Sequence, residues 1–348
     1  METTDRTSPD DLDSRKAAIL QAVVSEYIGT AQPVGSSTVA NTPDLEVSSA
    51  TIRAEMVALE REGYLVQPHT SAGRVPTDKG YRFFVDHLSK PGKLGLGQRR
   101  AVESFFESTR GETEAVLERA SGLLSDLTHQ TAVVVGPAHA AAVVRSVQVV
   151  DLGTSTALVV VVLADGTVEK RSMDISTSAE VAEAASRALT AALAGSVLSS
   201  APSIPVVGNP ELDAVMFSCG AALQEIAEEL SHERMFVGGN ARLAESFGAV
   251  DIVRDVLAIL EQQLVVVTLL RDVIERGLSV AIGEEHGYAP LASCAVVVAP
   301  VEVDDQTRGL VGLLGPTRMN YAESLAAAKL VGDRLGARLG SSHGDHDG

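Results

Sequence analysis

The sequence predicts an α+β protein in which an N-terminal winged helix-turn-helix precedes a sheet domain that carries a helical insertion. Three observations support this fold class. Residues 12–90 contain three short helical patterns and then a strand, a turn-rich segment and a second strand. Beyond residue 130 the chain becomes rich in valine, and two groups of strands are separated by a helical stretch. The 348 residues are enough for two or three domains.

Periodicity and capping residues define the elements of the N-terminal unit. Ile19, Val23 and Tyr27 recur at four-residue intervals on one helix face, and Pro33 prevents this helix from continuing. Serine is a favoured helix N-cap, and it stands before the second and third helical patterns. The predicted elements are helices over 13–27, 36–41 and 48–62, a strand at 64–66, the turn HTSAGR at 69–74, a strand residue at 75 and a helix over 77–88.

The remaining elements follow from composition and turn signals. Asp165-Gly166 is a typical hairpin turn between two valine-rich strands. The predicted elements are helices over 98–129, 178–198, 211–231, 251–262 and 321–339, with strands over 131–135, 144–152, 156–164, 168–175, 278–283 and 294–303. The expected domains are a disordered leader 1–11, a winged-helix domain 12–90, a linker 91–97, a sheet domain 98–204 and 264–340, an inserted dimerising domain 205–263, and a disordered tail 341–348.

Charge and composition exclude several classes of protein. The net charge is −18, so the chain is not a general polyanion binder. Residues 12–90 are nearly neutral, with eight basic and nine acidic side chains, which is a mild indication that this part faces a polyanion. The longest apolar run, 156–164, is too short to span a bilayer, and no signal peptide is visible. Cys219 and Cys294 lack metal-site spacing, which favours buried thiols and a cytoplasmic location.

The third predicted helix carries the residues of a candidate DNA reader. Small hydroxyl residues at a helix N-terminus allow close approach to DNA, and they can bind phosphate with the help of the helix dipole. An arginine one turn further along can read guanine in the major groove. The turn-rich segment would be the wing, and the start of the next helix would offer a further phosphate contact. The candidate DNA-binding residues are Ser48, Ser49, Thr51, Arg53, His69, Thr70, Arg74 and Lys79.

Residue chemistry alone leaves a protein-docking module as an alternative for this unit. Several longer strings are more specific: TAQPVGS (30–36), VSSATIRAEMVALEREGYLVQPHTSAGRVPTDKGYRFFVDHL (47–88), AIGEE (281–285) and GPTRMNY (315–321). Together they resemble the heat-inducible transcription repressor family, HrcA. The chain departs from the family pattern at Ala31, where members often have glycine, and at Ala54, where they often have asparagine.

The resemblance implies a winged-helix DNA-binding domain, a GAF-like sheet domain and an inserted dimerising domain. It also implies a homodimer that binds an inverted-repeat operator upstream of chaperone genes and depends on the chaperonin GroEL. We expect no enzymatic activity, no cofactor, no metal site and no membrane contact. In GPTRMNY we expect Arg318 to pair with Glu284 or Glu285 and to close the sheet against the last helix; a ligand or chaperonin contact is the alternative.

Two other functions remain open at this point. DLGTST (151–156) and FVGGNARL (236–243) resemble the phosphate and adenosine motifs of actin-like ATPases, although a second acidic phosphate loop is missing. A sheet domain of this kind could also bind a small metabolite, although its valine-rich strands offer few polar groups to orient a ligand. The histidines have no nucleophile at a telling spacing, and neither HExxH nor a P-loop occurs.

Overall fold

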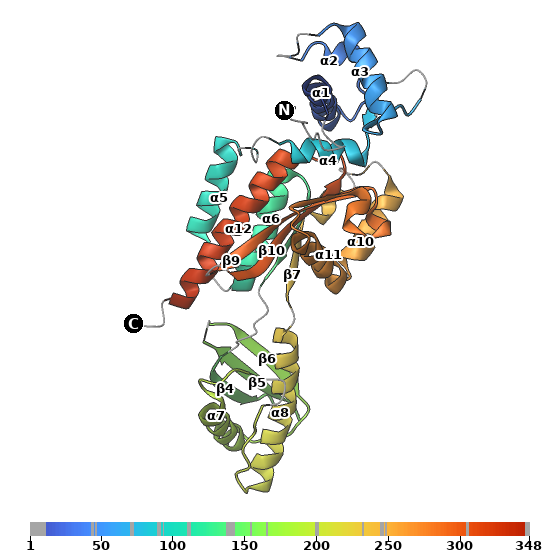
Figure 1. Cartoon of the computed structure of the whole chain (residues 1–348). Helices are drawn as coiled ribbons and strands as arrows, with labels where there is room; N and C mark the ends of the chain where they lie inside the picture. Colours follow the sequence, from blue (N-terminus) through green and yellow to red (C-terminus); the bar gives the residue numbers. More distant parts are fainter. Residues whose placement is uncertain are drawn as a thin grey trace, which may run out of the picture.

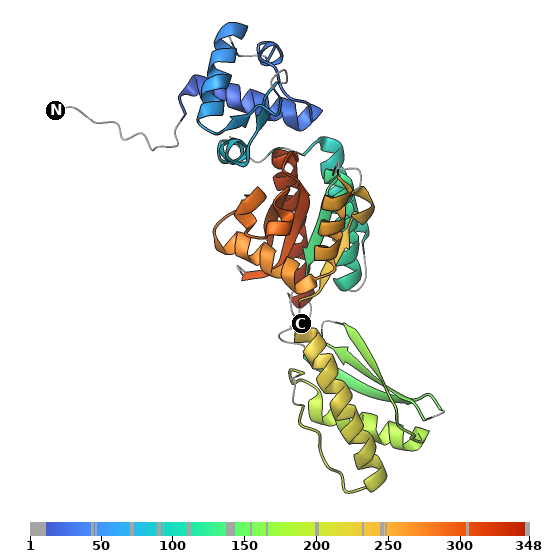
Figure 2. The same cartoon turned by 90° about the vertical axis from the view of Figure 1, so that its right-hand side faces the viewer.

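The protein is built from three bodies stacked in a row, as Figures 1 and 2 show. The computed structural model describes residues 12–344 except 43–44, 46, 70–72, 89–91, 93, 110–112, 137–142, 154, 165, 199–201, 232, 244–246, 248 and 304–305. The predicted leader 1–11 therefore lies outside the described residues. We call the three bodies the head (residues 12–88), the central domain (residues 96–135 and 235–344) and the lower lobe (residues 143–231).

The head contains all the elements expected for residues 12–88. They are α1 (Ser14–Thr30), α2 (Ser36–Val39), α3 (Ser49–Arg61), β1 (Leu65–Val66), β2 (Val75–Pro76) and α4 (Asp78–Asp86). Side-chain caps fix where the helices begin: Asp13 Oδ1 accepts the Lys16 N–H at 2.9 Å, and Thr77 Oγ1 accepts the Gly80 N–H at 3.2 Å. The antiparallel pair β1–β2 then returns the chain from α3 to α4.

The central domain is a five-stranded antiparallel sheet between two layers of helices. Its strands are β3 (Thr131–Val135), β7 (Met235–Gly238), β8 (Val280–Ile282), β9 (Cys294–Val303) and β10 (Gln306–Pro316), in the spatial order β7-β3-β10-β9-β8. Alternate residues face opposite sides. Val134 belongs to the core under α6 (Thr113–Thr128) and α12 (Tyr321–Gly344), whereas Val133 and Val135 belong to the core under α10 (Val250–Leu260) and α11 (Gln263–Glu275). Helix α5 (Leu96–Ser108) lies beside α12 (Figure 1).

The lower lobe has its own sheet and its own apolar core. Its elements are β4 (Val144–Asp151), β5 (Ala157–Leu163), β6 (Val168–Met173), α7 (Ala179–Leu193) and α8 (Pro210–Ser231). Both helices pack on the three-stranded sheet. The outer edge of β4 is covered by α7, because the Thr190 and Ser186 hydroxyls accept the N–H groups of Val147 and Val149 at 3.0 and 2.8 Å.

The structure divides the later part of the chain at other points than those expected. The segment 205–263 is not one inserted unit, because α8 packs on β4–β6 whereas β7 and α10 belong to the central domain. The insertion between β3 and β7 is the α/β lower lobe. Strands β4 and β6 have exposed residues along their length and so belong to a sheet with one covered face, whereas β3 is buried throughout.

Other differences concern single elements. Residues 98–129 form two helices, α5 and α6, rather than one, and β7, β10 and α11 were not expected. Residues 341–344, expected to be a disordered tail, continue α12. None of the helices in the described ranges combines the length and the apolar composition needed to cross a bilayer.

Candidate nucleic-acid interface

The N-terminus of α3 is held by hydroxyl groups that bond to one another. Ser48 caps the helix, since its Oγ accepts the Thr51 N–H at 3.2 Å and lies 2.9 Å from Thr51 Oγ1. Ser49 Oγ lies 3.3 Å from Ser36 Oγ on α2 and so joins the two helices. Ser48 and Ser49 are both exposed. Three of the predicted DNA-binding residues therefore lie together at one exposed helix end, where the dipole favours an anion.

One face of α3 packs inward and the opposite face is open. Ile52, Met56 and Leu59 are buried at helical spacing in the head core. The opposite face carries Ala50, Arg53, Ala54, Val57 and Arg61, of which all but the half-buried Val57 are exposed. Arg61 lies eight residues after Arg53, about two turns along the same face. Sequence reasoning missed Arg61, although this spacing from Arg53 could have indicated it.

The acidic side chains of α3 and of the residue that follows it form ion pairs with basic residues from other parts of the head. Glu55 lies 3.9 Å from Arg15, Glu60 lies 2.9 Å from Arg74, and Glu62 lies 2.6 Å from Lys16.

In contrast, Arg53 and Arg61 have no hydrogen bond or ion pair within the described part of the chain. The open face of α3 therefore carries two arginines that no acid pairs with among the described residues, although the chain as a whole has a net charge of −18.

The wing residues are placed differently from one another. His69 is exposed beyond β1, while Thr70 lies outside the described residues. The Arg74 side chain is only 13% exposed, and its Nε donates to Glu60 Oε2 at 3.0 Å. The backbone of Arg74 also exchanges two 2.9 Å hydrogen bonds with Val34. Arg74 thus fastens the wing to α3 and to the segment before α2, and this placement disfavours the predicted phosphate contact.

Lys79 lies away from the other candidates. Its ammonium stands 4.2 Å above the centre of the Tyr64 ring and 3.4 Å from the Glu62 carbonyl oxygen. Both partners follow the C-terminal end of α3. A helix of this length spans about 20 Å at 1.5 Å per residue, so Lys79 and Ser49 do not share one cluster. A phosphate contact by Lys79 would have to lie on a different part of the DNA backbone from those of the α3 N-terminus.

The other residues considered in the sequence analysis are buried or take part in contacts within the protein. Cys219 and Cys294 are both buried, as expected, and burial raises the pKa of each thiol to about 12. In GPTRMNY, Tyr321 is buried at the start of α12 and donates to the Thr317 carbonyl oxygen. Glu285, one of the two acids expected to pair with Arg318, is bound by Arg82 of the head.

The two ATPase-like motifs do not form one site. DLGTST spans the end of β4 and the turn into β5, where Asp151 Oδ1 accepts the Gly153 N–H at 2.8 Å. FVGGNARL begins in β7. The first motif belongs to the sheet of the lower lobe and the second to the central sheet. A nucleotide held by both motifs in one cleft, as in the ATPase alternative, is therefore not supported.

Comparisons with known proteins agree over almost the whole chain. A family model described as the HrcA protein C-terminal domain matches residues 114–325. The heat-inducible transcription repressor HrcA of Thermobifida fusca is 39% identical over 94% of this chain and 97% of its own length, and that of Frankia casuarinae is 38% identical over 95% and 99%.

A crystal structure described only as that of a hypothetical protein has a TM-score of 0.70 and 25% identity, covering 95% of this chain and 100% of its own. It therefore shares the overall fold of this chain. The family model covers more than half of the chain, and the named relatives match it nearly end to end. The chain belongs to the HrcA family of heat-inducible transcription repressors.

Proposed function

We propose that this repressor binds operator DNA through α3 of a winged helix-turn-helix formed by the head. The main support for this proposal is the open face of α3, where Arg53 and Arg61 are unpaired among the described residues. The neighbouring acids are instead paired with Arg15, Lys16 and Arg74. Arg53 would read base edges, while Ser48, Ser49 and Arg61 would contact phosphate. The central domain is then the GAF-like domain, and the repressor would act in the cytoplasm, where its operator lies.

The matching experiment is a gel shift with Arg53→Ala on an inverted-repeat operator from upstream of the organism's own chaperone genes. A base-contacting arginine contributes about 1–3 kcal/mol per half-site, so specific affinity should fall by about tenfold or more. Arg61→Ala should instead weaken binding to all sequences and flatten the salt dependence. Arg187→Ala, an exposed change in the lower lobe, is the charge-matched control. Unchanged operator affinity of Arg53→Ala would refute the assignment of α3.

We also propose that the protein is a homodimer joined through the lower lobe, because an inverted repeat requires two-fold symmetry in the protein. Phe217 on α8 is 80% exposed and Val206 before it is 85% exposed, although both are large and apolar. They line a cavity of 570 Å³ together with Ile204, Pro205 and Met216. Such a patch on one lobe is typical of a protein–protein contact.

Phe217→Glu should give a monomer in light scattering. Val250→Glu on α10 is the matched control, because Val250 is equally exposed, at 83%, but belongs to the central domain. If Val250→Glu dissociates the dimer and Phe217→Glu does not, the contact lies on the central domain instead.

We further propose that the active fraction of this repressor depends on chaperonin. The central sheet pairs β3 with β10, and Val135 and its partner Leu310 are 175 residues apart in sequence (310 − 135). Such long-range pairing folds slowly, and the uncharged runs in β5 and β9 are prone to aggregate while exposed. Chaperonin would raise the folded fraction, and heat, by drawing chaperonin to other proteins, would lower it.

The test is refolding from denaturant with and without GroEL, with operator binding scored per mole of protein. A higher yield of binding-competent protein with GroEL is expected. Equal yields in both arms, combined with heat-reversible loss of binding by the purified repressor alone, would favour an intrinsic thermosensor.

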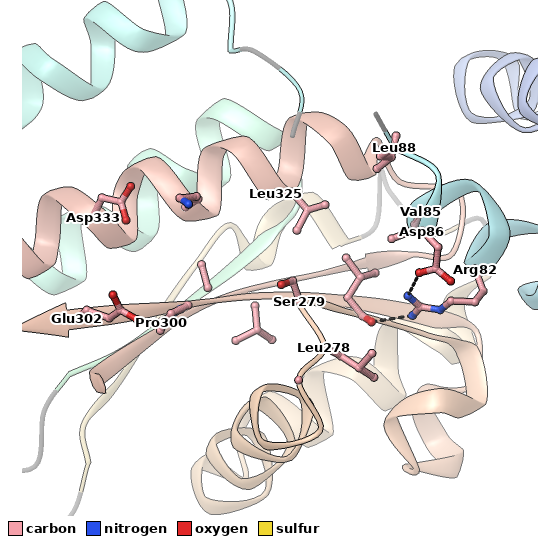
Figure 3. A pocket seen from close by; sticks show the side chains of 15 residues that line it. Arg82, Val85, Asp86, Leu88, Leu278, Ser279, Pro300, Glu302, Leu325 and Asp333 are labelled. Atoms are coloured by element: carbon pink, nitrogen blue, oxygen red, sulfur yellow. Dashed lines mark hydrogen bonds and ion pairs between the residues drawn. The ribbon is translucent and has the colours of Figure 1, made fainter. Parts of the chain in front are cut away.

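A groove beside the head supports the alternative of a metabolite-responsive repressor. A cavity of 510 Å³ lies between α4, the β8–β9 edge and α12 (Figure 3), and its size suits a small ligand. Its wall of Leu278, Pro300 and Leu325 is apolar, and Arg82 at its end already binds Asp86 and the Val280 carbonyl oxygen. Release of the operator by a small molecule that also protects Ser279→Cys from alkylation would support this alternative.

A further inference from the structure

Helix α4 of the head is fastened to the segment that follows β8. Arg82 Nε donates to Glu285 Oε1 at 2.8 Å, and a second Arg82 nitrogen donates both to Glu285 Oε2 and, at 2.7 Å, to the Val280 carbonyl oxygen. A third nitrogen donates to Asp86 Oδ1 at 3.2 Å (Figure 3). One guanidinium group therefore binds a carboxylate through two nitrogens and a backbone carbonyl of another domain, which fixes its position in several directions.

The partner of Arg82 is itself held rigidly. Glu285 Oε2 accepts the Ile282 N–H at 2.9 Å, and the Glu285 carbonyl oxygen accepts from Arg276 Nη1 at 2.8 Å. Gly283 has φ +57°, and a Cβ there would lie 1.9 Å from Asp78 Oδ2 in the first turn of α4. Glycine adopts this backbone conformation easily, and it leaves the space that the Asp78 carboxylate occupies.

Apolar and backbone contacts continue the same attachment. The rings of Tyr81 on α4 and Tyr321 on α12 are 6.0 Å apart, and both residues are buried. The linker after α4 is also fixed, since the Gly92 N–H donates to the Ala322 carbonyl oxygen at 3.1 Å and Leu94 is buried. The motifs AIGEE and GPTRMNY, which both lie far from α4 in the sequence, thus contact this one helix of the head.

We propose that Arg82, Asp78, Gly283 and Glu285 are positioning residues that fix the orientation of the head on the central domain and thereby set the spacing of the half-sites that the dimer accepts. The proposal rests on the proposed operator binding by a dimer. Two heads reach two half-sites together only if both half-sites face the protein. Because DNA turns once in 10–10.5 bp, five extra base pairs turn one half-site to the opposite side. A fixed head cannot follow this rotation, whereas a loosely held head can.

The experiment compares the full-length protein with Arg82→Met, Arg82→Lys and Glu285→Gln. Each binds three duplexes: the inverted repeat with its natural spacer, the same repeat with five added base pairs, and a single half-site. The unchanged protein should prefer the natural spacer by about tenfold or more, because the longer spacer engages one head only. In Arg82→Met and Glu285→Gln this preference should shrink to about twofold, while binding to the single half-site is unchanged. Arg82→Lys, which keeps the charge but loses the two-pronged contact, should be intermediate.

The control is Arg187→Met, which removes an exposed arginine from α7 of the lower lobe. Unchanged binding to the single half-site shows that the head of each variant is folded. The proposal is overturned if both variants keep the full preference for the natural spacer, or if they bind the natural operator more tightly than the unchanged protein, since the joint would then hold the heads away from DNA. Failure of the unchanged protein to bind any of the duplexes would instead refute the proposed operator binding itself.

Discussion

The junction between the head and the central domain and the one between the central domain and the lower lobe are built in different ways. At the upper junction one apolar core runs from Leu59 and Tyr81 in the head to Ile282 and Tyr321 in the central domain. The lower lobe has a separate core. At the lower junction Arg234 binds Glu169 of β6 at 2.8 Å and also pairs with Glu114 of α6, and these side chains are partly exposed.

The difference indicates which bodies move together. Continuous apolar burial couples two bodies strongly, whereas a partly exposed ion pair contributes only about 1 kcal/mol. We therefore expect the head and the central domain to move as one rigid body and the lower lobe to fold as a separate unit. A repressor built in this way would keep its DNA-reading surface in a fixed geometry and place the proposed dimer contact on the more independent lobe.

The largest effects should come from matched cavities in the two cores. Leu59→Ala in α3 and Leu223→Ala in α8 each remove a fully buried leucine side chain and should cost about 2–5 kcal/mol. Hydrogen exchange should show that Leu59→Ala weakens protection in both the head and the central sheet, whereas Leu223→Ala weakens it in the lower lobe alone. Equal loss of protection in β9 from both variants would show that the cores are coupled.

A smaller effect should come from adding one methyl group at the upper junction. Gly283→Ala combines left-handed backbone strain of about 1–2 kcal/mol with overlap on the Asp78 carboxylate. Gly277→Ala is the matched control, because it also has a positive φ, +73°, but has open space around its Cβ position. Gly283→Ala should lower the free energy of unfolding by about 2 kcal/mol more than the control, by the cost typical of overpacking. Equal losses in denaturant titrations would mean that the Asp78 carboxylate is displaced without cost and that close packing at Gly283 adds nothing to stability.

The smallest effect should be a dependence of the upper junction on pH. His286, beside the loop that binds α4, is buried, and burial lowers its pKa from the usual 6.5. Its Nδ1 accepts the Tyr288 N–H at 3.2 Å and its Nε2 donates to the Leu291 carbonyl oxygen at 2.9 Å, so the folded protein holds a neutral ring. The unfolded chain takes up the proton first. Stability is therefore full above pH 6.5 and falls as the pH drops toward the folded-state pKa.

Melting temperatures measured from pH 8 to pH 5 test this dependence. The unchanged protein should lose stability more steeply on acidification than His286→Gln. The pKa of Asp78 is raised, chiefly by burial, and acts in the opposite sense, but both proteins retain it. His69→Gln, an exposed change in the head, is the control and should follow the unchanged protein. Parallel curves for all three proteins would show that His286 does not cause the pH dependence of stability.

The head is predicted well from the sequence, whereas strand β10 is missed. The caps at Asp13, Ser48 and Thr77 are local signals, and the head follows them closely. Strand β10 escapes prediction because Gly309, Gly312 and Gly315 read as breaks. In the structure a Cβ at each would lie within 3 Å of a neighbouring residue, so these glycines serve close packing inside a strand.

The boundary of the inserted lobe is marked in the sequence by a change in strand composition. Strands β4 and β6 contain charged residues, whereas β3 and β9 are almost wholly apolar, and this contrast distinguishes a sheet covered on one face from a sheet covered on both. The roles of Arg74 and Arg82 could not be predicted in this way. Each arginine is bound by a glutamate that only the three-dimensional fold brings near, fourteen residues away at Glu60 and 203 residues away at Glu285.

The most direct test of a rigid upper and a looser lower junction is a pair of distance distributions from spin labels. Cysteines at the exposed positions Arg61, Glu107 and Arg187 would carry the labels in two pairs, 61–107 and 107–187, and the native thiols of Cys219 and Cys294 are buried and should not react. Labelled protein diluted with unlabelled protein reports distances within one chain. We expect one narrow distribution for 61–107, a broader one for 107–187, and broadening of only the first in Arg82→Met. A 61–107 distribution as broad as that of 107–187 would contradict a rigid junction between the head and the central domain.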